Sequence, residues 1–221
     1  MKRQFDISSR NRVRQLREKA VYDRARVHGI LDAGLVAHLA FVDNDSPVVQ
    51  PMLYARDGER ILLHGARKAR IIRVLESGSP VSLNVTMIDG IVVARSAFNS
   101  SMNYRSVTVF GTPRLVQGRE EKLHALKVLS EHLMPGRWSE LRDPHDREIK
   151  MTGVIELPIE SASAKISSGM PEDEDEDYAL PVWAGVVPVE ERLGTPLSDK
   201  KLPAGIELSP SIARLVGLAE D

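Results

Sequence analysis

Apolar residues in the first third of the chain change from helical spacing to short β-like runs. Residues 20–31 place apolar side chains at i, i+3 and i+4 and end at Asp32-Ala33-Gly34, which predicts a short amphipathic helix. Three apolar runs follow, at residues 35–42, 48–54 and 60–64. Because Asp-, Asn- and Gly-containing turns separate these runs, they predict three antiparallel strands.

The rest of the chain predicts further helices and β segments. Helices are predicted at residues 67–76, 120–133 and 143–151. β-rich segments are predicted at residues 81–88, 91–94 and 107–116, with a turn at Asp89-Gly90. Residues 154–159 and 162–166 predict one last strand that is broken or bulged at Pro158. Six or seven short strands with few helices favour a closed barrel.

Composition restricts the class of protein. The chain has 221 residues, of which 42% are hydrophobic, and this is enough for a packed core. Thirty Lys and Arg against 31 Asp and Glu give a net charge of −1, so no global field favours nucleic acid or an anionic membrane. The chain has no cysteine, which excludes a disulfide, a thiolate nucleophile and a Cys-bound metal. No segment approaches the roughly 20 apolar residues that span a bilayer, and we expect a cytoplasmic protein.

Positive charge gathers where the third predicted strand meets the next helix. Residues 64–70 read His-Gly-Ala-Arg-Lys-Ala-Arg, which places Arg67, Lys68 and Arg70 in the predicted first turn. A helix N-terminus carries about half a positive charge and unpaired N–H groups, so it ordinarily favours Asp or Glu. The three cations therefore indicate a bound anion such as a phosphate group. The alternative is a solvated basic helix start.

Two features late in the chain differ from their surroundings. Residues 172–177 alternate Glu and Asp, and because like charges repel, a solvated loop is favoured over a docking segment. Trp183 follows in the apolar segment 180–188, where two prolines stiffen the chain. It is either a core residue or a flat wall for an aromatic ligand.

Four segments together resemble the FMN-binding split barrels related to pyridoxamine 5′-phosphate oxidase. They are residues 51–54, 63–68, 101–111 and 177–187. The resemblance covers about residues 27–187 and implies a mainly β fold with flanking helices (α+β), a six- to seven-stranded antiparallel split β-barrel. It also implies FMN as the cofactor, with a deazaflavin as the alternative, and a homodimer that holds the cofactor at its interface.

The resemblance also implies which residues bind the cofactor. They are Pro51, Met52, Leu53, His64, Gly65, Arg67, Lys68, Asn84, Ser101, Asn103, Tyr104 and Trp183. Arg67 and Lys68 match the cations that clamp the FMN phosphate, and residues 51–53 match the strand along the flavin ring. Four of them, Asn84, Ser101, Asn103 and Tyr104, would approach from the second subunit. The Arg-rich C-terminus of the oxidase has no counterpart in residues 190–195, so the resemblance does not extend to its substrate.

His64 and Tyr104 are the candidates for contact with a substrate. The isoalloxazine itself carries hydride and electrons, so no acid–base pair is required. His64 stands beside the predicted phosphate site, where it can donate a hydrogen bond as a cation or as a neutral ring. The six histidines show no metal-ligand spacing, and we expect no metal site.

The predicted organisation has three parts. Residues 1–18 form a flexible arm outside the core, residues 19–188 an FMN-binding split-barrel domain, and residues 189–221 a tail that packs on the barrel or on the partner subunit. Three functions fit. The first is an FMN-dependent oxidoreductase acting on a small molecule, with NADH or NADPH as electron donor, and a nitroimidazole-reductase-like enzyme is one form of it. The second is a flavin-binding protein for storage or sensing, and the third binds another phosphate ligand or a polyanion.

Overall fold

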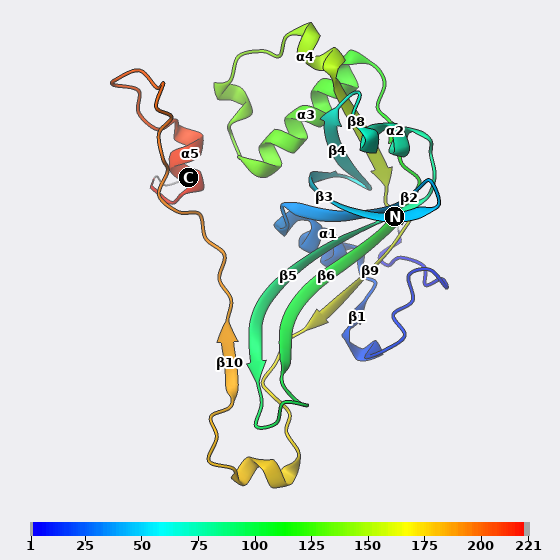
Figure 1. Ribbon diagram of the computed structural model, residues 1–221, viewed down its shortest axis with the longest axis vertical. Coiled ribbons are helices and arrows are strands. Elements are labelled where there is room, and N and C mark those ends of the chain that lie inside the picture. The colour runs from blue at the N-terminus through cyan, green and yellow to red at the C-terminus, as the bar shows by residue number, and fades with distance from the viewer. Residues whose placement is uncertain (1, 219–221) are drawn as a thin grey trace.

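An antiparallel sheet that curls into a barrel dominates residues 2–218, the part of the chain that the computed structural model describes (Figure 1). Its strands are β1 (Ala20–Val21), β2 (Val36–Asp43), β3 (Ser46–Asp57), β4 (Arg60–Ala66), β5 (Val81–Val93), β6 (Ser101–Gly111), β7 (Arg114–Leu115), β8 (Thr152–Pro158), β9 (Ser161–Ser167) and β10 (Gly185–Pro188). They lie in the order β1-β9-β6-β5-β2-β3-β4-β8-β7, and β10 pairs with the outer half of β5.

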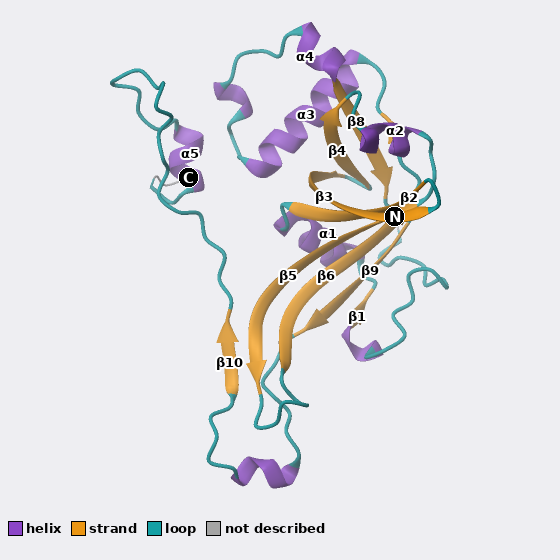
Figure 2. Cartoon of the chain, viewed as in Figure 1, coloured by secondary structure: helices purple, strands orange, loops and turns teal. Residues whose placement is uncertain are grey.

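Helices flank the barrel and gather mainly at one end of it (Figure 2). The α-helices are α1 (Arg24–Ala33), α2 (Arg70–Glu76), α3 (Arg119–Leu133), α4 (Asp146–Met151) and α5 (Pro210–Leu215), and the 3₁₀ helices are η1 (Arg17–Lys19), η2 (Trp138–Glu140) and η3 (Asp175–Ala179). The Asp23 side chain caps α1 by accepting a hydrogen bond from the Arg26 N–H. No helix within residues 2–218 combines the length and the apolar character needed to cross a membrane.

The barrel interior follows from strict alternation along the strands. In β2, Ala37, Leu39 and Phe41 point inward and are buried, while the intervening residues are largely exposed. A second, smaller apolar cluster lies between α3 and the outer face of β3, β4 and β8. It contains Ala55, Leu62, Val116, Ala125, Leu129 and Val154. Strand β4 therefore contributes Ile61 and Leu63 to the barrel core and Leu62 to the layer under α3.

The barrel closes where the end of β6 crosses the end of β8. A Cβ atom on Gly111 would lie 2.1 Å from the Pro158 carbonyl oxygen and 2.9 Å from Leu157 Cδ1. No side chain fits between two backbones at that separation. Gly111 is therefore required for the close approach that completes the barrel.

Strands β5 and β6 continue well beyond the barrel as a long arm, which we call the extension (Figure 1). Strand β10 runs along β5 there, and η3 lies at the tip. From β10 the chain turns back toward the helical end and finishes near α5. Residues 190–209 of this tail contain no helix or strand. The extension and the tail together give the molecule its elongated shape.

Several predicted boundaries differ from the structure. The Asp89-Gly90 turn is wrong: β5 runs through it, with a register irregularity between Ile88 and Gly90 that absorbs the local bend. The predicted last strand is two strands, because β8 pairs with β4 while β9 pairs with β6. The helix predicted over residues 20–31 begins only at Arg24, since Ala20 and Val21 pair with β9. Ten strands occur among the described residues, because the short strands β1, β7 and β10 add to seven longer ones.

The N-terminal arm contributes to the core, contrary to the prediction. Phe5 is 3% exposed and lies over the Arg24 guanidinium, whose central carbon is 4.0 Å from the ring centroid. The buried Asn11 amide donates to the carbonyl oxygens of Asp6 and Ala162. A single apolar residue and a single amide in a polar segment give no periodic signal, so the sequence pattern could not identify them.

Candidate cofactor site

The barrel splits where β3 and β4 separate. Residues 54–57 of β3 pair with β4, whereas residues 46–53 pair with β2 on the other side. The last pair before the split is Tyr54 with Leu63, so Leu53 and His64 stand on either side of the opening. Among the described residues, no strand continues along the β4 side of residues 46–53. This edge is where a ligand could meet the main chain of the predicted residues Pro51, Met52 and Leu53.

These three residues face different ways. Met52 is half-buried against the barrel core. Pro51 and Leu53 alternate with it and are exposed, Leu53 by 43%. A flavin at the split would therefore contact the side chains of Pro51 and Leu53 and the backbone of Met52.

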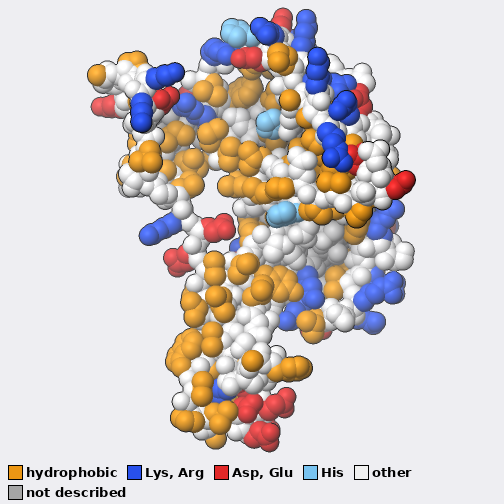
Figure 3. All heavy atoms as spheres, in the orientation of Figure 1, with side chains coloured by type: hydrophobic (Ala, Val, Ile, Leu, Met, Phe, Trp, Pro, Cys, Tyr) orange, Lys and Arg blue, Asp and Glu red, His pale blue; other side chains and the backbone are white. Residues whose placement is uncertain are grey.

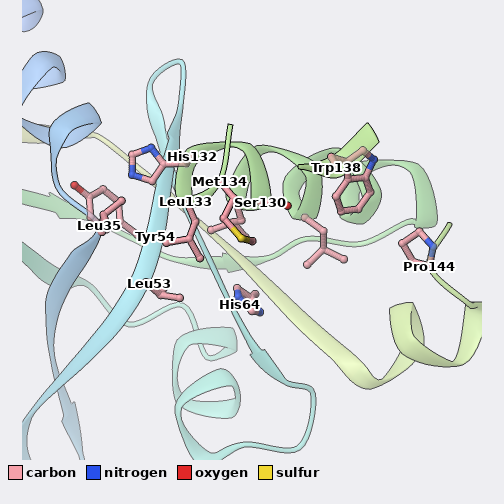
Figure 4. A pocket seen from close by; sticks show the side chains of 12 residues that line it. Leu35, Leu53, Tyr54, His64, Ser130, His132, Leu133, Met134, Trp138 and Pro144 are labelled. Atoms are coloured by element: carbon pink, nitrogen blue, oxygen red, sulfur yellow. The ribbon is translucent and has the colours of Figure 1, made fainter. Parts of the chain in front are cut away.

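A cavity of about 270 Å³ opens at the split, between the outer face of the barrel and α3 (Figure 4). Leucines from α3 form much of its wall, and Leu53, Tyr54 and His64 enter it from the sheet. The remaining wall comes from the segment that follows α3, through Met134, Trp138 and Pro144. The lining is predominantly apolar, which suits a flat hydrophobic ligand.

Two histidines lie on this cavity and differ in their bonding. The His64 ring makes no hydrogen bond with residues 2–218, and desolvation by the surrounding wall lowers its pKa below the ordinary value. The His132 Nε2 lies 2.8 Å from the Gly34 carbonyl oxygen, and its ring tilts against Tyr54 at a centroid distance of 5.7 Å. The neutral His64 ring thus keeps its nitrogens available, whereas one His132 nitrogen is already engaged.

The buried Tyr54 supports this side of the cavity. Its hydroxyl donates to the Leu31 carbonyl oxygen over 2.5 Å, and burial raises its pKa above the ordinary value. Tyr54 therefore acts as a neutral donor that ties the split edge of β3 to the end of α1.

The three cations of the basic loop are arranged differently from the prediction. Helix α2 begins at Arg70, and Arg67 and Lys68 lie in the turn before it, so the prediction of three cations in its first turn is wrong. The Arg67 guanidinium pairs with Glu76 over 2.8 Å, and Arg70 pairs with Asp43. Carboxylates of the chain thus already balance two of the three charges, while Lys68 has no ion pair within residues 2–218.

His64 and Gly65 at the end of β4 lead directly into this turn. A Cβ on Gly65 would lie 3.4 Å from Ile72 Cγ1, an ordinary contact, so Gly65 is not required by packing within the chain. The split and the basic turn therefore hold seven of the predicted residues. They are Pro51, Met52, Leu53, His64, Gly65, Arg67 and Lys68.

The other predicted residues lie elsewhere in the chain. Ser101, Asn103 and Tyr104 stand on the outer half of β6, and Trp183 lies beside β10, all on the extension. Asn84 lies on β5 within the barrel sheet, where its amide donates to the Val107 carbonyl and to Thr108 Oγ1. Within one chain these residues do not lie at the basic turn. Their predicted contact with the cofactor would need a second copy of the chain, and it stays a prediction.

Trp183 is 64% exposed, so of the two alternatives the core residue is excluded, and its predicted contact with a ligand stays a prediction. Its ring lies over Gly185, where a Cβ would come 3.0 Å from Trp183 Cζ2. An indole that exposes most of its surface leaves a large apolar area for a partner or a ligand.

The acidic run of residues 172–177 lies at the tip of the extension, and the prediction that it is a solvated loop is only partly confirmed. The Asp173 side chain has no exposed surface and accepts hydrogen bonds from the Arg95 backbone N–H and guanidinium, both over 2.9 Å. The guanidinium in turn lies over the Tyr178 ring at 4.9 Å. A solvated loop is therefore wrong for Asp173, which anchors the tip, while the acids around it are exposed or half-exposed.

Sequence reasoning missed the wall that α3 and the following segment build. Leu126, Leu129 and Leu133 form the apolar stripe that predicted the helix, and such a stripe is the same whether it covers core or a cavity. The available signal was Met134 and Trp138, two large apolar residues directly after the helix. Residues 2–218 contain no group of three or more His, Asp or Glu side chains arranged to hold a metal ion.

The barrel split, the free strand edge and the flanking helices define an antiparallel split-barrel fold, as predicted. The chain belongs to the pyridoxamine 5′-phosphate oxidase family, whose sequence profile matches residues 23–166. Both the fold class and the family resemblance are thereby confirmed. No protein with a curated function matches the chain.

Solved structures extend the comparison beyond the family profile. The flavocytochrome Anf3 from Azotobacter vinelandii is 36% identical, with a TM-score of 0.89 over 94% of this chain and 97% of that one. The FAD and haem binding protein from Mycobacterium smegmatis is 37% identical, with a TM-score of 0.86 over 90% and 97%. A putative 5-nitroimidazole antibiotic resistance protein from Bacteroides thetaiotaomicron is 20% identical, with a TM-score of 0.57 over 66% and 86%, and this likeness shows the fold alone.

Proposed function

We propose that this protein is a redox flavoprotein that also binds haem in the apolar cavity at the barrel split. The observation that carries the proposal is His64, whose unbonded ring faces a cavity with a mainly apolar wall. Two proteins 36% and 37% identical over nine-tenths of the chain are described as a flavocytochrome and as an FAD and haem binding protein. Their likeness supports the same pair of cofactors here.

The donor set of the cavity fits haem. Imidazole and thioether are two of the side-chain groups that ligate haem iron, and the wall offers His64 and Met134. The lowered pKa of His64 keeps its ring neutral at pH 7, which is the form that binds metal. The cavity volume of about 270 Å³ is just below the usual range of roughly 300–1,000 Å³ for ligand sites, so this chain alone would not enclose the group.

The proposed flavin site combines the free edge of β3 with the basic turn. Lys68 and Arg67 would hold a flavin phosphate, and Arg67 would first have to break its ion pair with Glu76. Residues 51–53 would lie along the flavin ring. The sequence resemblance predicts FMN, whereas the likeness to an FAD and haem binding protein favours FAD. A second copy would supply Ser101, Asn103, Tyr104 and Trp183 from its extension, which makes the proposed protein a homodimer.

Each side chain then has a defined task. When bound, the flavin and the haem supply hydride and one-electron chemistry, and the protein binds and orients them. His64 fixes the position of a group in the cavity, the leucines of α3 exclude water from it, and the basic turn anchors a phosphate. His64 and Tyr104 remain the candidates for contact with a small-molecule substrate, and NADH or NADPH for electron supply. A storage or sensing role would use the same binding residues without turnover.

The haem proposal is tested by loading the purified protein with haem and recording its absorbance spectrum. We expect a Soret band that reaches saturation at one haem per chain. His64→Ala should lower haem affinity by at least about tenfold, since it removes the imidazole that would hold the haem iron. His124→Ala is the matched control, because His124 lies on α3 but is bonded to Asp57 on the surface. A His64→Ala variant with unchanged spectrum and affinity would contradict the assignment.

The flavin proposal is tested separately by titration with FMN and FAD. Arg67→Ala with Lys68→Ala should lower affinity by about two orders of magnitude, because charge-assisted bonds contribute roughly 1.5–3 kcal/mol each. Arg73→Ala is the matched control, because Arg73 is a cation in the last turn of α2, the short helix that follows the basic turn. Equal affinities of the double variant and the wild type would remove the basic turn from the site. The mass of the released cofactor distinguishes FAD from FMN and from a deazaflavin.

A further inference from the structure

We infer that the C-terminal helix α5 braces the outer wall of the apolar cavity, and that Glu140 is the positioning residue that joins the two. The inference rests on the proposed haem site, because the cavity is the one assigned to haem. Glu140 does not line the cavity, so it would act through its neighbours.

The braced wall is the corner that follows α3. Met134 and Trp138 line the cavity from this corner, where only the single turn of η2 is helical. The Glu131 side chain stabilises the turn by accepting hydrogen bonds from the Gly136 N–H over 2.7 Å and from the Trp138 N–H over 2.9 Å. The position of the Trp138 ring therefore depends on a short irregular segment rather than on a long helix.

Helix α5 docks on the outside of this corner. The Glu140 carboxylate accepts hydrogen bonds from the Ser211 N–H over 2.8 Å and from the Ser211 hydroxyl over 2.5 Å, so it caps α5 from another segment. The Arg137 guanidinium donates to the Ser209 hydroxyl over 2.7 Å and pairs with Glu140 over 3.0 Å. Ser211 is 2% exposed, so the contact excludes water.

The backbone of the corner is shaped to receive the helix. Gly136 has a φ of +81°, and a Cβ there would lie 2.8 Å from the Arg214 guanidinium and 3.8 Å from Ser211 Cβ. A residue with a side chain would have to displace Arg214. The positive φ and the lack of a side chain together allow α5 to approach.

This corner is also the attachment of the whole tail. Three side-chain hydrogen bonds join residues 190–218 to the rest of the described chain, and all three involve Arg137 or Glu140. Between β10 and α5 the tail is extended, with Leu197 94% exposed and Leu193 57% exposed. Loss of the Glu140 contacts would therefore release α5 and leave the cavity wall without its outer support.

At neutral pH the Glu140 side chain is ionised, and this favours its contact with Ser211 of α5. Hydrogen bonds from the Ser211 hydroxyl and N–H, with Arg137 beside them, lower the pKa of Glu140 to about 2. A carboxylate with a lowered pKa stabilises the docked form above its unfolded value of about 4.3, and the effect is lost as pH falls toward 2. The brace is therefore fully formed at neutral pH.

The first test compares Glu140→Ala with Glu148→Ala. Glu148 is the matched control, because its pKa is also lowered to about 2 and it caps α4 while pairing with Arg142, but it has no bond to the tail. We expect Glu140→Ala to raise the rate of haem transfer to excess apomyoglobin by about tenfold, and Glu148→Ala by less than twofold. Ser211→Ala, which keeps the N–H bond, should give a smaller increase in the same direction.

The second test needs no cofactor, so it separates this inference from the haem proposal. The chain has two tryptophans, and in a Trp183→Phe background the emission reports Trp138 alone. Glu140→Ala should shift that emission to the red and increase amide exchange over residues 136–141, while Glu148→Ala should do neither. Unchanged Trp138 emission in Glu140→Ala overturns the brace. If the wild-type protein binds no haem while Glu140→Ala still shows the red shift, only the proposed function is overturned.

Discussion

Both halves of β5 contain apolar residues, but the two halves have different surroundings. In the barrel half, Val81, Leu83 and Val85 are between 0 and 7% exposed, because they belong to the packed core of the barrel. In the extension half, Ile88 is 47% and Ile91 53% exposed. One strand thus passes from the covered barrel to the extension, where Ile88 and Ile91 are uncovered although the neighbouring Val92 is only 6% exposed. An apolar pattern predicts that a strand has an apolar face. Whether that face is buried depends on the elements that pack against it in the tertiary structure.

The uncovered face continues across the extension. Apolar side chains gather on the extension in Figure 3, and its exposed apolar residues include Ile88, Ile91, Met102, Val182, Trp183 and Val187. Contiguous apolar surfaces of this kind ordinarily mark an interface. This observation supports the proposal that a second copy covers the extension and supplies its residues to the cofactor.

The first prediction compares truncations in the two regions. Leu63→Ala in the barrel core should lower the free energy of unfolding by about 3–4 kcal/mol, because it leaves a cavity among fully buried side chains. Ile91→Ala on the extension should cost less than about 1 kcal/mol in the monomer. Urea unfolding of both variants at the same low protein concentration measures the difference. Equal losses would show that the extension is as well packed as the barrel.

The second prediction concerns the closure of the barrel. Gly111→Ala should lower the free energy of unfolding by about 2–3 kcal/mol, because the added Cβ meets the Pro158 carbonyl and forces β6 and β8 apart. Gly29→Ala is the control. Its Cβ would meet nothing within 4 Å inside α1, so it should stabilise the protein by about 0.5–1 kcal/mol. A Gly111→Ala variant as stable as the wild type would mean that the barrel is not closed at this point.

The accuracy of the sequence predictions follows the same division. The barrel strands from Val36 to Ala66 could be predicted closely, because alternation and turn residues are local signals. The extension could not, since the polar residues 99–103 resemble a loop although β6 already begins at Ser101. Pairing with the outer half of β5 keeps that stretch extended, and this pairing is not visible in a local pattern.

The candidate site divides in a similar way. The position of the basic turn after β4 could be predicted from the sequence, but the partners of its cations could not. Glu76 lies nine residues beyond Arg67, and Asp43 lies 27 residues before Arg70. Such pairs depend on the tertiary fold, so the sequence suggested three free charges where the structure leaves Lys68 without an ion pair among the described residues. The cavity was likewise hidden, because its wall uses the same apolar stripe as a core helix.

The third prediction tests whether the extension is an interface. Trp183→Ala should leave unfolding of the monomer almost unchanged, because the indole is 64% exposed, yet weaken self-association by about tenfold. Sedimentation velocity across a concentration series measures the association. The control is Leu197→Ala on the tail, which removes a side chain that is 94% exposed and lies away from the strands of the extension. Equal effects of the two substitutions would remove Trp183 from the interface.

The last prediction has the smallest effect on overall stability and concerns the tip of the extension. Desolvation raises the pKa of Asp173, but its hydrogen bonds from Arg95 outweigh this effect and leave the pKa below its ordinary value. The contact is therefore present above the unfolded pKa of about 3.9 and is lost as pH falls through the lower folded value. Asp173→Asn should accelerate proteolysis of residues 168–182 at pH 7, whereas Asp175→Asn, an exposed neighbour without an ion pair in the described chain, should not. If both variants are cleaved at the wild-type rate, Asp173 does not hold the tip. Packing of Trp183 and pairing of β10 would then be what stabilises this end of the extension.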